Sequence, residues 1–175
     1  MQAWLRELEF QGPFDFAKRA WTTSVRQEPL VYRLRVWDDV AGTFRQLARA
    51  GGVDVEGVLD IGESQHGRTR LVEFCCAVEG KHRSHRAGLE YSWYDFASTF
   101  PIDHLRIEFL HVESKELAEG IELALLEDYR WRFKDRPPLN GSSGKAKKVE
   151  QWLASLDRQP RKDGWLDLDG LVPRQ

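Results

Sequence analysis

The sequence lacks the features of a membrane protein and of a disulfide-stabilised secreted protein. Its longest apolar runs are about five residues, as at 74–78, whereas a membrane-spanning helix needs about 20. The segment 1–10 alternates apolar and charged residues and has no apolar centre typical of a signal peptide. The only cysteines, Cys75 and Cys76, are adjacent, which suits neither a disulfide nor a metal pair. We therefore expect reduced thiols, a cytoplasmic location and no membrane partner.

The chain also lacks a strong charge of one sign. Its 26 basic and 28 acidic residues leave a net charge of −2 over 175 residues. A phosphate-bearing partner would therefore have to bind at a local basic patch rather than through bulk charge. There is no internal repeat and no low-complexity tract, so the length predicts one domain with extensions.

Alternating side chains predict the first clear strand at 30–37, with apolar residues on one face and arginines on the other. Ser64 and Ser114 are predicted helix N-caps, because each precedes apolar residues at helical spacing. The other expected elements are strands at 57–64 and 104–112, short helices at 13–21 and 43–49, and helices at 64–80, 114–133 and 145–156.

This order of elements predicts an α/β sandwich with a small three-stranded antiparallel sheet flanked by helices. We expect the domain itself to span 29–143. The segment 1–28 then reads as an N-terminal extension, and 144–175 as a C-terminal helix and tail.

Three polar residues stand out from this pattern. Tyr32 lies among apolar residues of its strand, so its hydroxyl needs a partner or a chemical role; a core tyrosine is the alternative. Glu122 has apolar neighbours on its helix, so its carboxylate loses contact with water unless a partner neutralises it. Such a carboxylate is a candidate metal ligand or acid–base group. The alternative is a residue at the rim of the core that pairs with an arginine. Asn140 follows the stiff Pro137–Pro138 pair, which would hold its amide in place. It is therefore a candidate active-site residue, with a turn residue as the alternative.

Taken together, five segments resemble the GIY-YIG endonuclease superfamily. They lie in the family's order and cover about 30–140. The segments are LVYRLRV at 30–36, LDIGES at 59–64, GRTRL at 67–71, IELALLEDY at 121–129 and PPLN at 137–140.

The resemblance implies a role for each matching residue. Tyr32 would help to activate the attacking water, and Arg70 would contact the phosphate and stabilise developing charge. Glu122 would hold the divalent metal, Mg²⁺ or Mn²⁺, and Asn140 would close the site. Gly62 would allow the turn towards the active site. One carboxylate suits Mg²⁺, which keeps several of its waters.

The chain departs from the family pattern where the second motif has a tyrosine, because Asp60 stands there. Glu63 and Phe74 also differ from the usual residues, and the connection between the first two strands is longer than usual. We expect Asp60 to share a strand face with Val58 and, in an active enzyme, to orient the attacking water or share the metal.

Basic residues cluster around the expected site despite the acidic total. They predict a path for the DNA backbone, with a solvated charged surface as the alternative. His82 and His85 with the two cysteines match no usual zinc spacing, and the segment 141–145 lacks the phosphate-loop pattern. The predicted DNA-binding residues are Arg68, Lys81, Arg83, Arg86, Lys145, Lys147 and Lys148.

Two functions follow from these observations. The first is a metal-dependent DNA endonuclease that hydrolyses phosphodiester bonds. The second is a catalytically degenerate module of the same fold that binds DNA or a protein without cleavage. Domains of this kind often gain specificity from a dimer or another domain, so we expect DNA as a partner, together with a second copy or a partner protein.

Overall fold

The protein has a mixed α+β fold organised around a curled antiparallel sheet, seen in a computed structural model that describes residues 3–81 and 84–141. The strands of this sheet run in the order β1, β7, β2, β3, and β6 also pairs with β2. A separate two-stranded hairpin, β4 with β5, lies beside it. The strands are β1 (Gln11–Asp15), β2 (Leu30–Asp38), β3 (Thr43–Phe44), β4 (Leu47–Arg49), β5 (Gly52–Asp54), β6 (Val58–Ser64) and β7 (Leu105–His111).

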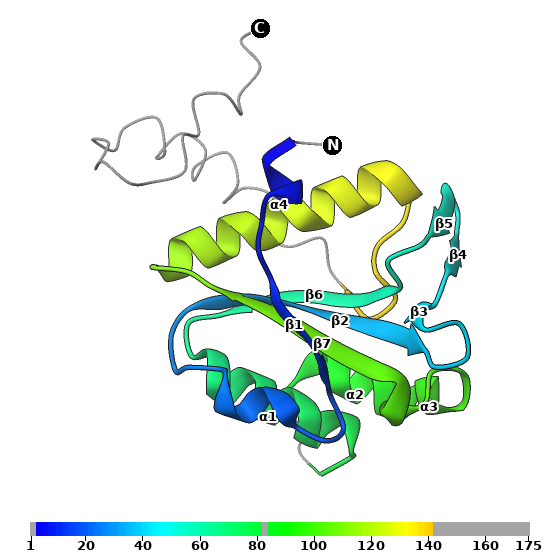
Figure 1. Cartoon of the computed structure of the whole chain (residues 1–175), viewed down its shortest axis with the longest axis horizontal. Helices are drawn as coiled ribbons and strands as arrows, with labels where there is room; N and C mark the ends of the chain where they lie inside the picture. The colour runs from blue at the N-terminus through cyan, green and yellow to red at the C-terminus, as the bar shows by residue number, and fades with distance from the viewer. Residues whose placement is uncertain (1–2, 82–83, 142–175) are drawn as a thin grey trace, which may run out of the picture.

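Helices cover both faces of the sheet (Figure 1). The long helix α4 lies on one face, and α1, α2 and α3 lie on the other. Short 3₁₀ turns join some of these elements, at Ala3–Arg6, Ala20–Thr23 and Ile102–His104. The helices are α1 (Gly67–Val78), α2 (Arg86–Trp93), α3 (Phe96–Thr99) and α4 (Lys115–Phe133).

The alternation along β2 divides the hydrophobic core into two layers. Leu30, Tyr32, Leu34 and Val36 are buried against α1 and α2, whereas Val31 belongs to the cluster under α4. The predicted two-faced strand is therefore confirmed. Because β2 is hydrogen-bonded to both β6 and β7, its side chains lie at the centre of the sheet.

The ends of the helices follow from local chemistry. Ser114 caps α4 as predicted, because its hydroxyl accepts a hydrogen bond from the backbone N–H of Leu117 at 3.1 Å. Gly80 ends the α1 segment with a φ of +73°, a conformation that glycine adopts without strain. Ser64 does not cap α1, which begins three residues later; its hydroxyl accepts from the N–H of His66 instead.

Several sequence predictions are wrong in detail. The sheet is larger than the three strands expected, because β1 and β3 join it. Residues 13–21 form part of β1 and a 3₁₀ turn rather than a helix, and 43–49 form two short strands. The helix expected at 145–156 lies outside the described residues. None of the helices within 3–81 and 84–141 is long and apolar enough to cross a membrane.

Asp60 lies on the opposite face from the one predicted. The pairing of β2 with β6 shifts register between Leu34 and Arg35, which marks a bulge in β6. Asp60 then pairs with Leu34 and bonds to Tyr32, whereas Val58 packs in the cluster under α4. The extra residue in β6 breaks the simple alternation on which the prediction depended.

Candidate functional site

Three buried polar side chains form a hydrogen-bonded chain between the sheet and α2. The Tyr32 hydroxyl donates to Asp60 Oδ2 at 3.2 Å and lies 3.0 Å from His85 Nε2. Their exposed fractions are 1% for Tyr32, 3% for Asp60 and 1% for His85. The Tyr32 hydroxyl therefore depends on Asp60 and His85 for hydrogen bonds that water supplies elsewhere.

The hydrogen bonds assign the tautomer of His85. The backbone N–H of Gly88 donates to His85 Nδ1 at 3.4 Å, so the proton of the neutral ring lies on Nε2. Burial, followed by the positive charge of Arg70, lowers the pKa of His85 to about 3, so the ring is neutral near pH 7. Nε2–H then donates to the Tyr32 oxygen, whose own proton is directed at Asp60.

Packing holds this chain in place. The ring of His85 stacks on Phe74 with centroids 4.0 Å apart and planes 2° apart. A Cβ atom at position 62 would overlap the Tyr32 hydroxyl, so only glycine fits there. His85 was missed from the sequence as a site residue. The signal available was its position as the N-cap of α2, but nothing in the sequence indicated that α2 packs over Tyr32.

Burial controls the protonation of Tyr32 and Asp60. It raises the pKa of Tyr32 well above 10.0, with the nearby charge of Asp60 acting in the same direction. It also raises the pKa of Asp60 well above 3.8, opposed by the hydrogen bond from Tyr32. Tyr32 is thus a neutral phenol at pH 7 and, in this conformation, neither residue is open to a substrate.

Arg70, on α1, is the cation of the site. Its charge acts on Tyr32, Asp60 and Glu122, lowering the pKa of each against the effect of burial. Its own side chain is half-buried. Within 3–81 and 84–141, the Arg70 guanidinium has no carboxylate at ion-pair distance, which leaves its donors available to an anion.

Glu122 lies on α4 within reach of the same field. Burial raises its pKa to about 7, and repulsion from Glu63 and then Glu119 adds to the effect, while Arg70 opposes it. A cation bound at Glu122 would lower its pKa again, because it would favour the charged carboxylate. Glu63 lies on β6, so the carboxylates come from both the helix and the sheet edge.

Asn140 binds the backbone of the edge strand rather than facing open space. Its Nδ2 donates to the carbonyl of Ile61 at 2.7 Å, and its Oδ1 accepts from the N–H of Ile61 at 2.9 Å. The backbone N–H of Leu139 also donates to Leu59 O at 2.8 Å. Asn140 therefore holds β6 next to Asp60, much as a further strand would.

Only some of the predicted DNA-binding residues fall in the described part of the chain. Lys81 and Arg86 are largely exposed, and their ion pairs with Glu79 and Glu90 are of the weak surface kind. The Arg86 guanidinium also lies close to Gly141, next to Asn140. Arg68 is exposed on the first turn of α1. Arg83, Lys145, Lys147 and Lys148 lie outside the described residues.

No group of three or more His, Cys, Asp or Glu side chains in the described ranges is arranged to bind a metal. A cavity lies elsewhere, beside β4 and α3, and it is lined by none of Tyr32, Asp60, Arg70, Glu122 and Asn140. Comparison of the chain with protein-family models, curated proteins and solved structures finds no match.

Proposed function

We propose that this protein is a divalent-metal-dependent DNA endonuclease of the GIY-YIG type. The observation that carries the proposal is Arg70: a half-buried cation without a carboxylate partner in the described chain, whose field reaches Tyr32, Asp60 and Glu122. A guanidinium presents a rigid fork of N–H donors that matches the oxygens of a phosphate, so a phosphate ligand accounts best for an Arg70 without a carboxylate partner.

The order of elements also supports the proposal. The strand with the first motif, β2, is hydrogen-bonded between β6 and β7, and α1 and α4 follow β6 and β7 in the chain. Tyr32 and Gly62 are register partners on β2 and β6. Residues that match the family motifs thus come from neighbouring elements, as the resemblance requires.

The surroundings of Glu122 would favour a bound divalent cation, because burial, followed by repulsion from Glu63 and Glu119, raises the pKa of Glu122. Glu122 would hold the ion as the single direct ligand. A bound Mg²⁺ would supply Lewis acidity for phosphodiester hydrolysis. Arg70 would bind the non-bridging phosphate oxygens and stabilise the charge that develops on them.

The buried chain supports these groups from behind. Asp60 accepts a hydrogen bond from the Tyr32 hydroxyl, and His85 donates one to the Tyr32 oxygen, so the phenol has one fixed orientation. Asn140 fixes the backbone between Asp60 and Gly62. In this conformation, the three buried side chains position β6 and do not touch the substrate.

Burial of Tyr32 and Asp60 favours the second candidate function, a module that binds DNA or a protein without cleavage. An attacking water needs a base that it can reach, and here both groups lie under the surface. The two candidates make opposite predictions for a cleavage assay.

The test is incubation of supercoiled plasmid with the purified chain, with Mg²⁺ or Mn²⁺ and with a chelator. We expect metal-dependent nicking that Glu122→Gln reduces by about 10²-fold or more while DNA binding persists. Glu127→Gln is the matched control, since that carboxylate lies on the same helix and is exposed.

Two results would contradict the proposal. If Glu122→Gln cleaves at the wild-type rate, Glu122 does not hold the metal, and the proposed site is wrong. If the wild-type chain binds DNA but never cleaves it with either metal, the binding module is the correct function.

A further inference from the structure

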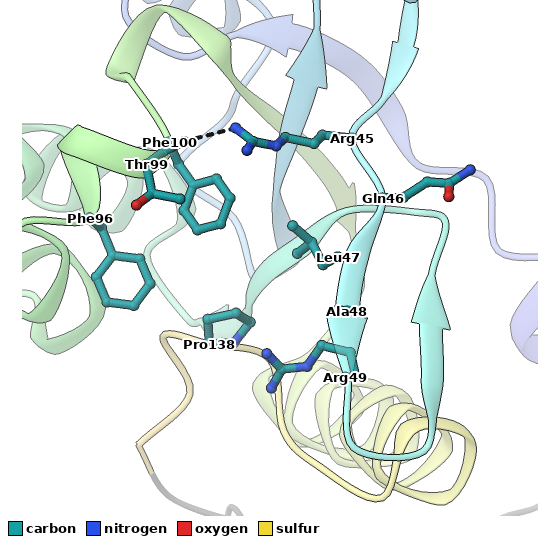
Figure 2. Close-up of a pocket in the computed structure, with 9 residues that line it drawn as sticks. All are labelled: Arg45, Gln46, Leu47, Ala48, Arg49, Phe96, Thr99, Phe100 and Pro138. Atoms are coloured by element: carbon teal, nitrogen blue, oxygen red, sulfur yellow. Dashed lines mark hydrogen bonds between the residues drawn. The ribbon is translucent and has the colours of Figure 1, made fainter.

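A second candidate site is a cavity of about 390 Å³, built by the long connection between β2 and β6 (Figure 2). This volume is in the range of small-molecule sites, about 300–1,000 Å³. Side chains from β4, from α3 and from the segment before Asn140 surround it. The lining residues are Arg45, Gln46, Leu47, Ala48, Arg49, Phe96, Thr99, Phe100 and Pro138.

One side of the cavity is flat and apolar. The rings of Phe96 and Phe100 lie 6.1 Å apart with planes inclined at 31°, and both pack against the core below. Figure 2 shows the two rings on one side of the space, with the end of Arg45 beside Phe100 and with Leu47 between Arg45 and Arg49. Walls of this kind suit a planar ring, because aromatic faces stack on one another.

Arg45 places a fixed positive charge at the cavity. Its Nη1 donates to the carbonyl of Thr99 at 2.8 Å, and its guanidinium carbon lies 5.2 Å from the centre of the Phe100 ring. No carboxylate of the described residues forms an ion pair with Arg45. The guanidinium is thus held in place with donors left over.

Arg49 adds a second guanidinium with an unused donor. Its Nη2 bonds to Asp135 Oδ2 at 2.6 Å and to the carbonyl of Arg136. Its Nε is buried and has no hydrogen-bond partner in the parts of the chain that the structure describes. A buried donor without an acceptor is unfavourable, so a hydrogen bond from this group to a ligand oxygen would favour binding.

We propose that this cavity binds one unpaired nucleotide of the DNA, an inference that rests on the proposed function. The base lies against Phe96, Phe100 and Pro138, and the phosphate lies between Arg45 and Arg49. A planar ring joined to an anion matches both the aromatic half and the arginine half of the cavity. A base that is stacked and paired inside a duplex could not reach the aromatic half. The substrate is therefore DNA with a flipped, frayed or single-stranded nucleotide.

The test is a titration of the full, ¹⁵N-labelled chain with dAMP, deoxyadenosine and inorganic phosphate, without metal. We expect dAMP to shift the amide signals of Gln46, Ala48 and Thr99 in a saturable way. Deoxyadenosine and phosphate should bind at least about tenfold more weakly, because each occupies only half of the cavity. Equal affinity for phosphate and dAMP, or no shift with dAMP, would overturn the proposal.

Variants separate this site from the proposed active site. Arg45→Gln and Phe100→Leu should each weaken dAMP binding at least about fivefold, while Lys18→Gln, an exposed charge change, should not. Because Phe100→Leu alters packing, Arg45→Gln is the decisive variant; unchanged affinity there would also overturn the proposal. Glu122→Gln should bind dAMP normally, because Glu122 does not line the cavity. A wild-type chain that cleaves DNA but does not bind dAMP would disprove the nucleotide site and leave the proposed endonuclease function intact.

Discussion

The arginines of β2 and the arginine of α1 differ in how they interact with nearby carboxylates. Arg33 and Arg35 on β2 both bond to Glu108 on β7, at 2.6 Å and 2.7 Å. Arg70 lies near Asp60 and Glu122, yet it forms no such pair within the described residues.

The difference separates a structural charge from one available to a ligand. Glu108 is 5% exposed and Arg35 is 8% exposed, so the first group is a closed network in which most donors have a partner. It stabilises the fold only as a complete unit. The charge of Arg70 instead acts on buried acids that lie beyond ion-pair distance. Its donors are therefore available to an anion that binds and dissociates.

The largest effect on stability is expected at the closed network. Glu108→Gln would leave Arg33 and Arg35 without a counter-charge and should lower the free energy of unfolding by about 3–5 kcal/mol. Urea unfolding followed by tryptophan fluorescence measures this change. The matched control is Glu28→Gln, which removes an exposed pair with Arg26 and should cost less than about 1 kcal/mol. Similar losses in the two variants would show that burial of the network is irrelevant.

A smaller loss is expected from the buried chain behind Arg70. His85→Ala removes the stack on Phe74 and leaves the Tyr32 oxygen without its donor, which should cost about 2–4 kcal/mol in urea unfolding. His104→Ala, at a partly exposed position, should change stability by less than about 0.5 kcal/mol. If the His85 variant were equally harmless, the hydrogen-bonded chain would contribute nothing to the fold.

Glu122 should give a still smaller, pH-dependent effect. Its pKa is raised from 4.5 to about 7 in the folded chain, so the folded state holds a proton that the unfolded state releases. The stability from this group is fully present below pH 4.5 and is lost as the pH rises to 7. Without divalent metal, the free energy of unfolding of the wild type should fall by on the order of 2 kcal/mol more than that of Glu122→Gln across this window.

Comparing the two proteins cancels the titration of groups on which the charge of Glu122 does not act, such as His85. The charges that act on Glu122 are those of Glu63, Glu119 and Arg70, and all three are retained in the variant. Parallel stability curves for the two proteins would mean that the Glu122 carboxylate is well solvated or already paired, and the proposed metal ligand would lose its support.

The sequence alone predicted the central strands and the main helices well, because each carries its own periodic signal. The alternation in β2 and the Ser114 cap are local features that need no knowledge of distant residues. Arg33 and Arg35 were expected on the solvated face of a half-buried strand. Their burial depends on Glu108, which is 73 or more residues away, so it could not be predicted.

Parts of the candidate site could not be predicted from the sequence, because they too depend on contacts between distant residues. Asp60 shares a face with Tyr32 because it pairs with Leu34 of β2, and the bulge that follows turns Val58 to the other face. His85 reaches Tyr32 because α2 packs against α1. The cavity beside β4 comes from the long connection after β2, which the sequence indicated only as extra length. Residues that match a motif could be assigned from sequence, whereas residues brought in by packing could not.

The most direct test of the central claim is the single-turnover cleavage rate of Arg70→Gln on plasmid DNA with Mg²⁺, measured together with its urea unfolding midpoint. We predict that the rate falls by about 10²–10³-fold. The free energy of unfolding should stay within about 0.5 kcal/mol of the wild type, because no ion pair with a described residue is lost. An unchanged cleavage rate, a wild-type chain that does not cleave, or a loss of stability as large as that of Glu108→Gln would contradict the claim that Arg70 is reserved for phosphate.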